Sequence, residues 1–277
     1  MSPYQELTLR NAGYVSDGLQ QSIRDCRVLI AGCGIGSTIA EAAVRIGFER
    51  FVLADADRVE PHNLNRQAYC KGDIGDLKAH ALERRIRSIN PEARVLSVPE
   101  YVGPGNGAHL VSGCDLVFDT IDFLDLNGIV SLHDEANRQG KPLISAMSAG
   151  WGAALMYFPP ADGVSSLFRR IFGLPERGAV ENASYVQCFA RLFEVLAGRL
   201  SPEIVEAMAR ALRVMEDGIP CPAPHVSPGS YSVAALAVSC AVQLLRGVPV
   251  SEAPNLILVD LLGELAGGGI RVLDTPA

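Results

Sequence analysis

Three glycines stand close together in the segment Gly32-Cys33-Gly34-Ile35-Gly36-Ser37, directly after a short apolar run. Glycine lets the backbone approach a ligand closely and adopt a positive φ. The N–H groups at the start of a following helix favour an anion. We therefore predict that Gly32, Gly34 and Gly36 cradle the phosphates of a nucleotide.

Two acidic residues follow the next apolar run, Phe51 to Ala54. Asp55 lies about 20 residues beyond the glycine loop, where an acid that binds a nucleotide ribose is expected. Asp57 has two interpretations: a second nucleotide-binding acid, or a residue that caps the loop after it. Together with the glycine loop, this spacing predicts a nucleotide site.

Four further segments carry a more specific pattern: DADRVEPHNLNRQ (55–67), DIGDLKA (73–79), INP (89–91) and DLVFDTID (115–122). In this order and spacing they resemble the ThiF/MoeB/HesA family of ubiquitin-activating-type adenylyltransferases. The resemblance covers about residues 10–160, returns at about 220–262 and lapses between them. It implies that AMP is transferred from ATP, with Mg²⁺, to a carboxylate.

The resemblance also implies roles for single residues. Arg66 and Lys78 match basic positions that contact the phosphates, and Asp122 matches the acid that organises Mg²⁺ across them. Asn63 would help to hold the phosphates. Because the carboxylate and the triphosphate are both anions, and charge grows in the pentavalent transition state, the chemistry needs such cations.

Two residues lie outside these segments. Arg10 resembles the N-terminal arginine that family dimers insert into the neighbour's ATP site, which implies a homodimer. Cys221 falls within one residue of the cysteine that sulfur-transferring members use to form a bond to the carrier. His225 follows in the same proline-rich segment and would lower the pKa of this thiol. An unreactive loop cysteine is the alternative.

Several departures indicate a divergent family member. The loop GCGIGS lacks one glycine of the usual G-x-G-G-x-G pattern. After the Mg²⁺-binding acid the family usually has Asn, and Arg five positions on, whereas this chain has Phe123 and Asn127. The 7 cysteines form no C-x-x-C pair, so we expect no tetrathiolate zinc site of the kind that many members carry.

The favoured substrate is the C-terminal Gly of a ubiquitin-like sulfur-carrier protein, and a small-molecule or peptide carboxylate is the close alternative. Two other classes stay open: an NAD-dependent oxidoreductase, and a catalytically silent nucleotide-binding or scaffold protein. A dehydrogenase would not need Arg66, Lys78 and Asp122.

The elements that must position these residues alternate between strands and helices. Such alternation predicts an α/β fold, with a doubly wound, largely parallel Rossmann-like sheet. The predicted strands are 28–31, 51–54, 94–98, 115–118, 142–146 and 153–158, with a further edge strand near 256–260. We divide the chain into a helical lead-in (1–26), a nucleotide-binding domain (27–162), a helical insertion (163–220) and a C-terminal helix and strand that complete the domain (221–277).

Other polar residues have simpler interpretations. We interpret Asp119 and Asp125 as turn acids rather than metal ligands. His62, His109, His133 and His225 lack metal-ligand spacing, and we expect them in loops or at the surface.

The charge and hydropathy of the chain exclude some partners. The formal net charge of −7 argues against binding to nucleic acid or to an anionic membrane. The start of the chain has no secretion-signal pattern, and the longest apolar stretch, around Val233 to Leu245, is too short to span a bilayer. We therefore expect a cytoplasmic protein.

Overall fold

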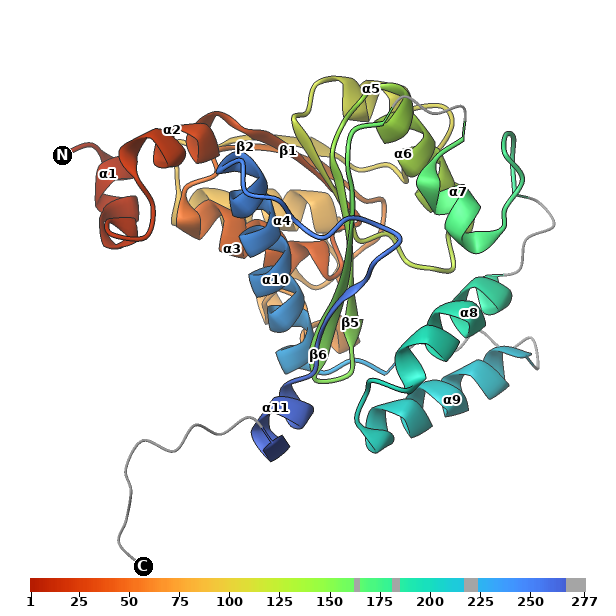
Figure 1. Ribbon diagram of the computed structural model, residues 1–277. Coiled ribbons are helices and arrows are strands. Elements are labelled where there is room, and N and C mark those ends of the chain that lie inside the picture. The colour runs from red at the N-terminus through yellow and green to blue at the C-terminus, as the bar shows by residue number, and fades with distance from the viewer. Residues whose placement is uncertain (162–164, 181–184, 217–223, 268–277) are drawn as a thin grey trace, which may run out of the picture.

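A computed structural model describes residues 1–161, 165–180, 185–216 and 224–267 (Figure 1). Within them the chain forms a 7-stranded sheet in the order β3-β2-β1-β4-β5-β6-β7. β1 to β5 are parallel, while β6 and β7 each run antiparallel to the strand before them in the sheet. This confirms the predicted fold class. The strands are β1 (Arg27–Ala31), β2 (Arg50–Ala54), β3 (Arg94–Val98), β4 (Leu116–Asp119), β5 (Leu143–Ala149), β6 (Gly152–Phe158) and β7 (Ile257–Val259).

The strand order reverses at β1, since the chain builds β2 and β3 on one side and β4 and β5 on the other. In open parallel sheets, ligands bind beyond the carboxyl ends of the strands at such a reversal. Ala31, the last residue of β1, is in register with Ala54 of β2 and Asp119 of β4. The loops after these three strands therefore begin side by side.

Helices cover both faces of the sheet (Figure 1). On one face α3 (Gly36–Ile46), α4 (Lys78–Ile89) and α10 (Ser227–Leu245) share a core with Val28 and Ile30 of β1. On the other, α5 (Gly107–Ser112) and α6 (Leu126–Arg138) share one with Leu29 and Ala31. Successive strand residues point to opposite faces, so Val28 to Ala31 of β1, which are all buried, must be apolar.

Helix α3 begins at Gly36, earlier than the start at Thr38 that the sequence pattern suggests. The space that a Cβ of Gly36 would occupy is taken by Ile30 and Thr120. Glycine at this position thus lets the first turn of α3 pack tightly against β1 and the loop after β4. The turn between β1 and α3 is correspondingly short.

Three helices lie within the predicted insertion: α7 (Leu167–Phe172), α8 (Tyr185–Ala197) and α9 (Pro202–Glu216). α9 packs on the turn between β5 and β6, where Ile204 fills the space beside Gly150 and Trp151 donates to Glu203 at 3.0 Å. The hydroxyl of Ser201 donates to Asp260 at 2.6 Å, which links α9 to the residue before α11 (Leu261–Gly267). The insertion therefore flanks the carboxyl end of β5.

The N-terminal segment lies at the opposite end of the sheet. It forms α1 (Pro3–Thr8), a 3-10 turn (Leu9–Asn11) and α2 (Asp17–Asp25). Tyr4 donates to the carbonyl of Gly47 at 3.0 Å, and Asn11 to that of Ile46 at 3.0 Å, so both hold the carboxyl end of α3.

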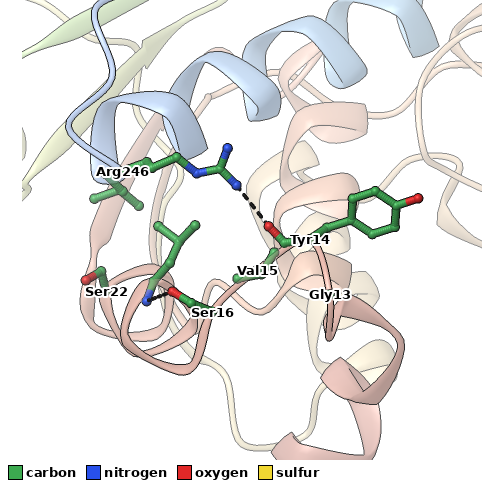
Figure 2. A pocket seen from close by; sticks show the side chains of 8 residues that line it. Gly13, Tyr14, Val15, Ser16, Ser22 and Arg246 are labelled. Carbon is green, nitrogen blue, oxygen red and sulfur yellow. Dashed lines mark hydrogen bonds between the residues drawn. The ribbon is translucent and has the colours of Figure 1, made fainter.

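A pocket of about 490 Å³ opens between α2 and the end of α10 (Figure 2). Arg246 lies on its wall and donates to the carbonyl of Tyr14 at 2.9 Å. α10 has 19 residues, so this pocket is about 30 Å from the other end of the helix. It is remote from the carboxyl ends of β1, β2 and β4.

Helix α10 is long and apolar enough to cross a membrane by length and composition, contrary to the expectation drawn from the shorter run Val233 to Leu245. In the fold, however, half of its most apolar window is buried, and Val233, Ala237 and Ala241 lie in the core shared with α3 and β1. Its packing is that of a core helix.

Candidate nucleotide-binding site

The glycine loop closes against the loops after β2 and β4. Gly32 has a φ of +86°, and its N–H donates to the carbonyl of Ala54 at 2.9 Å. A Cβ on Gly32 would collide with the backbone of Thr120, whose hydroxyl donates to the Gly32 carbonyl at 2.6 Å. Glycine is therefore required at this turn for both its backbone angle and its lack of a side chain.

Asp55 joins β2 to the glycine loop. Its carboxylate accepts the N–H of Cys33 and the N–H of Asp57, both at 2.7 Å. Burial raises the pKa of Asp55, and Lys78 and these two bonds oppose the rise. A carboxylate accepts about four hydrogen bonds, so the ribose-binding role of Asp55 stays a prediction that this geometry permits.

Lys78, the first residue of α4, is buried and paired with Asp57. Its Nζ lies 2.7 Å from Oδ2 of Asp57, and Oδ1 accepts the hydroxyl of Tyr101 at 2.5 Å. Burial raises the pKa of Asp57, but the bonds from Lys78 and Tyr101 outweigh it and lower the pKa below its usual value. The Asp57 side chain therefore holds Lys78 and does not simply cap its loop.

Tyr101 was not predicted from the sequence. Its hydrogen bond to Asp57 is the main cause that raises the pKa of Tyr101 to about 12. The sequence signal that could have identified Tyr101 is its position shortly after β3, at the same edge of the sheet as the glycine loop.

Asn63 ends a 3-10 turn (Pro61–Asn63), and Arg66 lies just after this turn. Asn63 is buried, and its side-chain oxygen accepts the N–H of Glu60 at 2.9 Å. Arg66 donates from one terminal nitrogen to the His62 carbonyl and to the Asn65 side chain, both at 2.9 Å, while its Nε is buried without a partner. Asn63 thus shapes the loop, and Arg66 keeps a donor free. Their contacts with phosphate stay predictions.

Asp122 lies exposed in the turn after β4, where it accepts the N–H of Leu124 at 3.0 Å. Burial lowers the pKa of Arg66, and the charge of the Asp122 carboxylate partly opposes this. Burial also lowers the pKa of His225 to about 4, with Arg66 adding to the shift and Asp122 opposing it. His225 lies in a loop, as expected, but Asn65 donates to its carbonyl at 3.1 Å, so it packs against the loop that carries Arg66.

The arrangement of acids fits a Mg²⁺ ion that is held mainly by phosphates. Among the described residues, no group of three or more His, Cys, Asp or Glu side chains would hold a metal ion by itself. Mg²⁺ commonly takes one or two carboxylates and completes its shell with phosphate oxygens and water. The exposed carboxylate of Asp122 meets this requirement, and its metal role stays a prediction.

Asp119 and His133 differ from expectation. Asp119 accepts the N–H of Ile121 in the turn at 3.2 Å, as a turn acid does, but it is also buried, and its Oδ2 lies 3.0 Å from Nε2 of His133 and 3.0 Å from the hydroxyl of Ser145. His133 is buried on α6, between Phe158 and Phe168. These polar groups satisfy one another, which permits their burial in the core. Asp125 is a capping acid, as expected, and accepts the N–H of Gly128 at 2.9 Å.

The remaining predicted residues lie elsewhere. Arg10 is exposed on the 3-10 turn that packs at the far end of α3, so it can serve a nucleotide site only in another copy of the chain. Cys221 lies outside the residues that the structure describes.

Comparison with known proteins decides the family. Residues 8–266, nearly the whole chain, match the ThiF family. The chain belongs to the ThiF family. The fold, the glycine loop and the polar residues after β2 and β4 are thus features of a ThiF-family protein.

Two relatives show how far sequence similarity extends. The chain is 36% identical over 133 residues to the tRNA threonylcarbamoyladenosine dehydratase of Escherichia coli, covering 47% of this chain and 49% of that protein. It is 27% identical over 195 residues to the Sulfur carrier protein adenylyltransferase of Thermus thermophilus, covering 68% and 71%. The chain thus spans about half the length of the first relative.

Solved structures share the fold. SeMet PaaA superposes with a TM-score of 0.65 at 20% identity, covering 93% of this chain and 77% of that one. The E. coli dehydratase TcdA, solved in complex with ATP, superposes with a TM-score of 0.59 at 21% identity, covering 89% and 96%. At this identity the likeness concerns the fold alone.

Both departures after Asp122 are explained by the insertion. The ring of Phe123 packs edge-on against Phe172 of α7, with 6.0 Å between centroids. The side-chain oxygen of Asn127 accepts the N–H of Val180 at 3.1 Å. In this ThiF-family chain, these two positions hold the insertion against α6.

Proposed function

We propose that this protein is an adenylyltransferase that uses ATP to activate a carboxylate. The observation that carries the proposal is that a glycine loop, the buried Lys78, the partly unpaired Arg66 and the exposed Asp122 all follow the adjacent carboxyl ends of β1, β2 and β4. Membership of the ThiF family and the name of the Thermus thermophilus relative support it.

In the reaction, a carboxylate oxygen attacks the α-phosphorus, a new acyl–oxygen–phosphorus bond forms, and the bond to the leaving pyrophosphate breaks. Lys78 and Arg66 stabilise the negative charge that develops on the phosphate oxygens. Asp57 keeps Lys78 in place, and Asp55 orients the ribose. A Mg²⁺ ion at Asp122 would neutralise phosphate charge.

The favoured substrate is the C-terminal Gly of a ubiquitin-like sulfur-carrier protein, in line with the named activity of the Thermus thermophilus relative. A small-molecule or peptide carboxylate is the second candidate. The insertion favours it, because α9 packs on the turn after β5, at the same end of the sheet as the nucleotide loops.

The proposal extends to assembly. Because Arg10 is exposed, it is free to reach the nucleotide site of a second copy, and the proposed active unit is a homodimer. The proposed location is the cytoplasm. Cys221 remains the proposed thiol for transfer. Its replacement by Ser should spare formation of the acyl-adenylate, because AMP transfer does not use the sulfur.

Exchange of labelled pyrophosphate into ATP tests the function. The assay uses the full chain, Mg²⁺ and a ubiquitin-like carrier that ends in Gly-Gly, with the same carrier lacking its last Gly as the matched control. We expect exchange with the first carrier only. Exchange with peptide or small carboxylates alone would select the second substrate class, and no exchange with any acid would contradict adenylylation.

A further inference from the structure

Three buried polar atoms at the site have no partner: Nε of Arg66, Oε1 of Gln67 and Nδ1 of His225. Buried polar atoms in folded proteins nearly always have one. Gln67 is 8% exposed, and its amide nitrogen is only 3.4 Å from the place where a Cβ of Gly34 would stand. Gln67 thus lies against the glycine loop, and Arg66 precedes it on the same loop, so their unpaired atoms point to a ligand at this place.

Hydrogen bonds to two neighbouring segments fix the backbone around His225. The side chain of Asn65 donates to its carbonyl at 3.1 Å, so the loop that carries Arg66 also holds His225. α10 begins at Ser227, and Thr38 of α3 donates to the carbonyl of Ser230 at 3.1 Å. The start of α10 is therefore fixed to α3 directly behind the glycine loop.

The imidazole has the properties of a hydrogen-bond donor to an anion. A neutral imidazole donates from one ring nitrogen. Nδ1 of His225 and the Nε–H of Arg66 are both buried and unpaired, and each can donate to an anionic oxygen.

We infer that His225 binds a phosphate oxygen of ATP together with Nε of Arg66. The inference rests on the proposed function and adds a binding residue from the segment before α10. Phosphate is favoured as the source of the oxygen because Asn65, which holds the His225 carbonyl, precedes Arg66 on one loop, and Gln67 of that loop lies against the glycine loop predicted to cradle the phosphates.

Calorimetry on the full chain tests this with two ligands, Mg-ATP and adenosine, which lacks phosphate. His225→Leu keeps bulk but removes the donor, and His225→Asn keeps an N–H near the position of Nδ1. His109→Ala is the matched control, an exposed histidine on α5. We expect the Kd for Mg-ATP to rise about tenfold or more in His225→Leu, and less than about threefold in His225→Asn. Adenosine binding should be unchanged in all variants.

Other outcomes separate the two claims. If wild type binds Mg-ATP and His225→Leu binds it equally well, the phosphate role of His225 is wrong while the proposed function stands. If His225→Leu weakens ATP and adenosine alike, the residue only supports the fold, and the inference is again overturned. If wild type binds no ATP, the proposed function and the inference both fail.

Discussion

Two arginines show how the helical insertion differs from the nucleotide-binding region. Arg169, in the insertion, is 2% exposed; its Nε bonds both oxygens of Asp134 at 2.9 Å, and its other nitrogens donate to the carbonyls of Pro175 and Gly178. Arg66, in the nucleotide region, is also partly buried, yet its Nε has no partner. The hydrogen-bond donors of Arg169 are paired within the protein, whereas Arg66 keeps one donor unpaired.

The difference in hydrogen bonding indicates that the nucleotide-binding region binds a ligand, whereas the described residues of the insertion bind other parts of the protein. A buried donor that is left unpaired destabilises a fold by about 1 to 3 kcal/mol, so a region that retains several must gain from a ligand. In the insertion, polar groups and the Phe123–Phe172 contact bind the insertion to α6. The nucleotide region is therefore organised for binding, and the insertion for holding its own position.

The largest effect should come from removing charge in the nucleotide region. Lys78→Ala and Asp122→Ala should each lower pyrophosphate exchange by roughly a hundredfold or more, because each removes one electrostatic contact of the transition state. Arg138→Ala is the control, an exposed arginine on α6 that pairs with Glu135. Full activity in either test variant would remove that residue from the reaction.

Arg169→Ala should act on stability instead. It leaves Asp134 with only the Ser166 hydroxyl as a donor and leaves the two carbonyls without one, so we expect the free energy of unfolding to fall by about 3 kcal/mol. The Kd for Mg-ATP should stay within about twofold of wild type. Denaturant titration and calorimetry measure the two quantities. A loss of ATP binding without a loss of stability would break the distinction between the regions.

Tyr101→Phe should have the smallest effect. It removes one hydrogen bond to Asp57 while Lys78 remains paired, so the KM for ATP should rise by about threefold with little change in kcat. Steady-state kinetics at several ATP concentrations checks this split. A hundredfold fall in kcat would mean that the Tyr101 hydroxyl itself contacts the reacting groups.

The fold and the main binding loops were predictable from the sequence, because they depend on local patterns. Apolar runs such as Val28 to Ala31 mark buried strands, and a glycine-rich turn between strand and helix marks a phosphate loop. The carboxyl ends of neighbouring parallel strands meet at one edge, so Asp55 and Asp122 could be assigned to the same site.

Side-chain pairings over long separations were not predictable. The partners of Asp119 are on α6 and β5, and those of Asp57 follow β3 and begin α4, so only the packed fold shows them. His225 follows the same rule, because Asn65 holds its carbonyl across 160 positions. A polar residue in a single sequence does not reveal whether its partner is protein, solvent or ligand.

Binding of Mg-ATP and of NAD to the wild-type chain, compared by calorimetry, tests the central claim most directly. The unpaired donor of Arg66, the buried Lys78 and the carboxylate of Asp122 suit a triphosphate with its metal ion better than the diphosphate of NAD. We predict that Mg-ATP binds at least about tenfold more tightly than NAD, and that removing Mg²⁺ with a chelator weakens ATP binding. Tighter binding of NAD, unaffected by Lys78→Ala, would contradict the account.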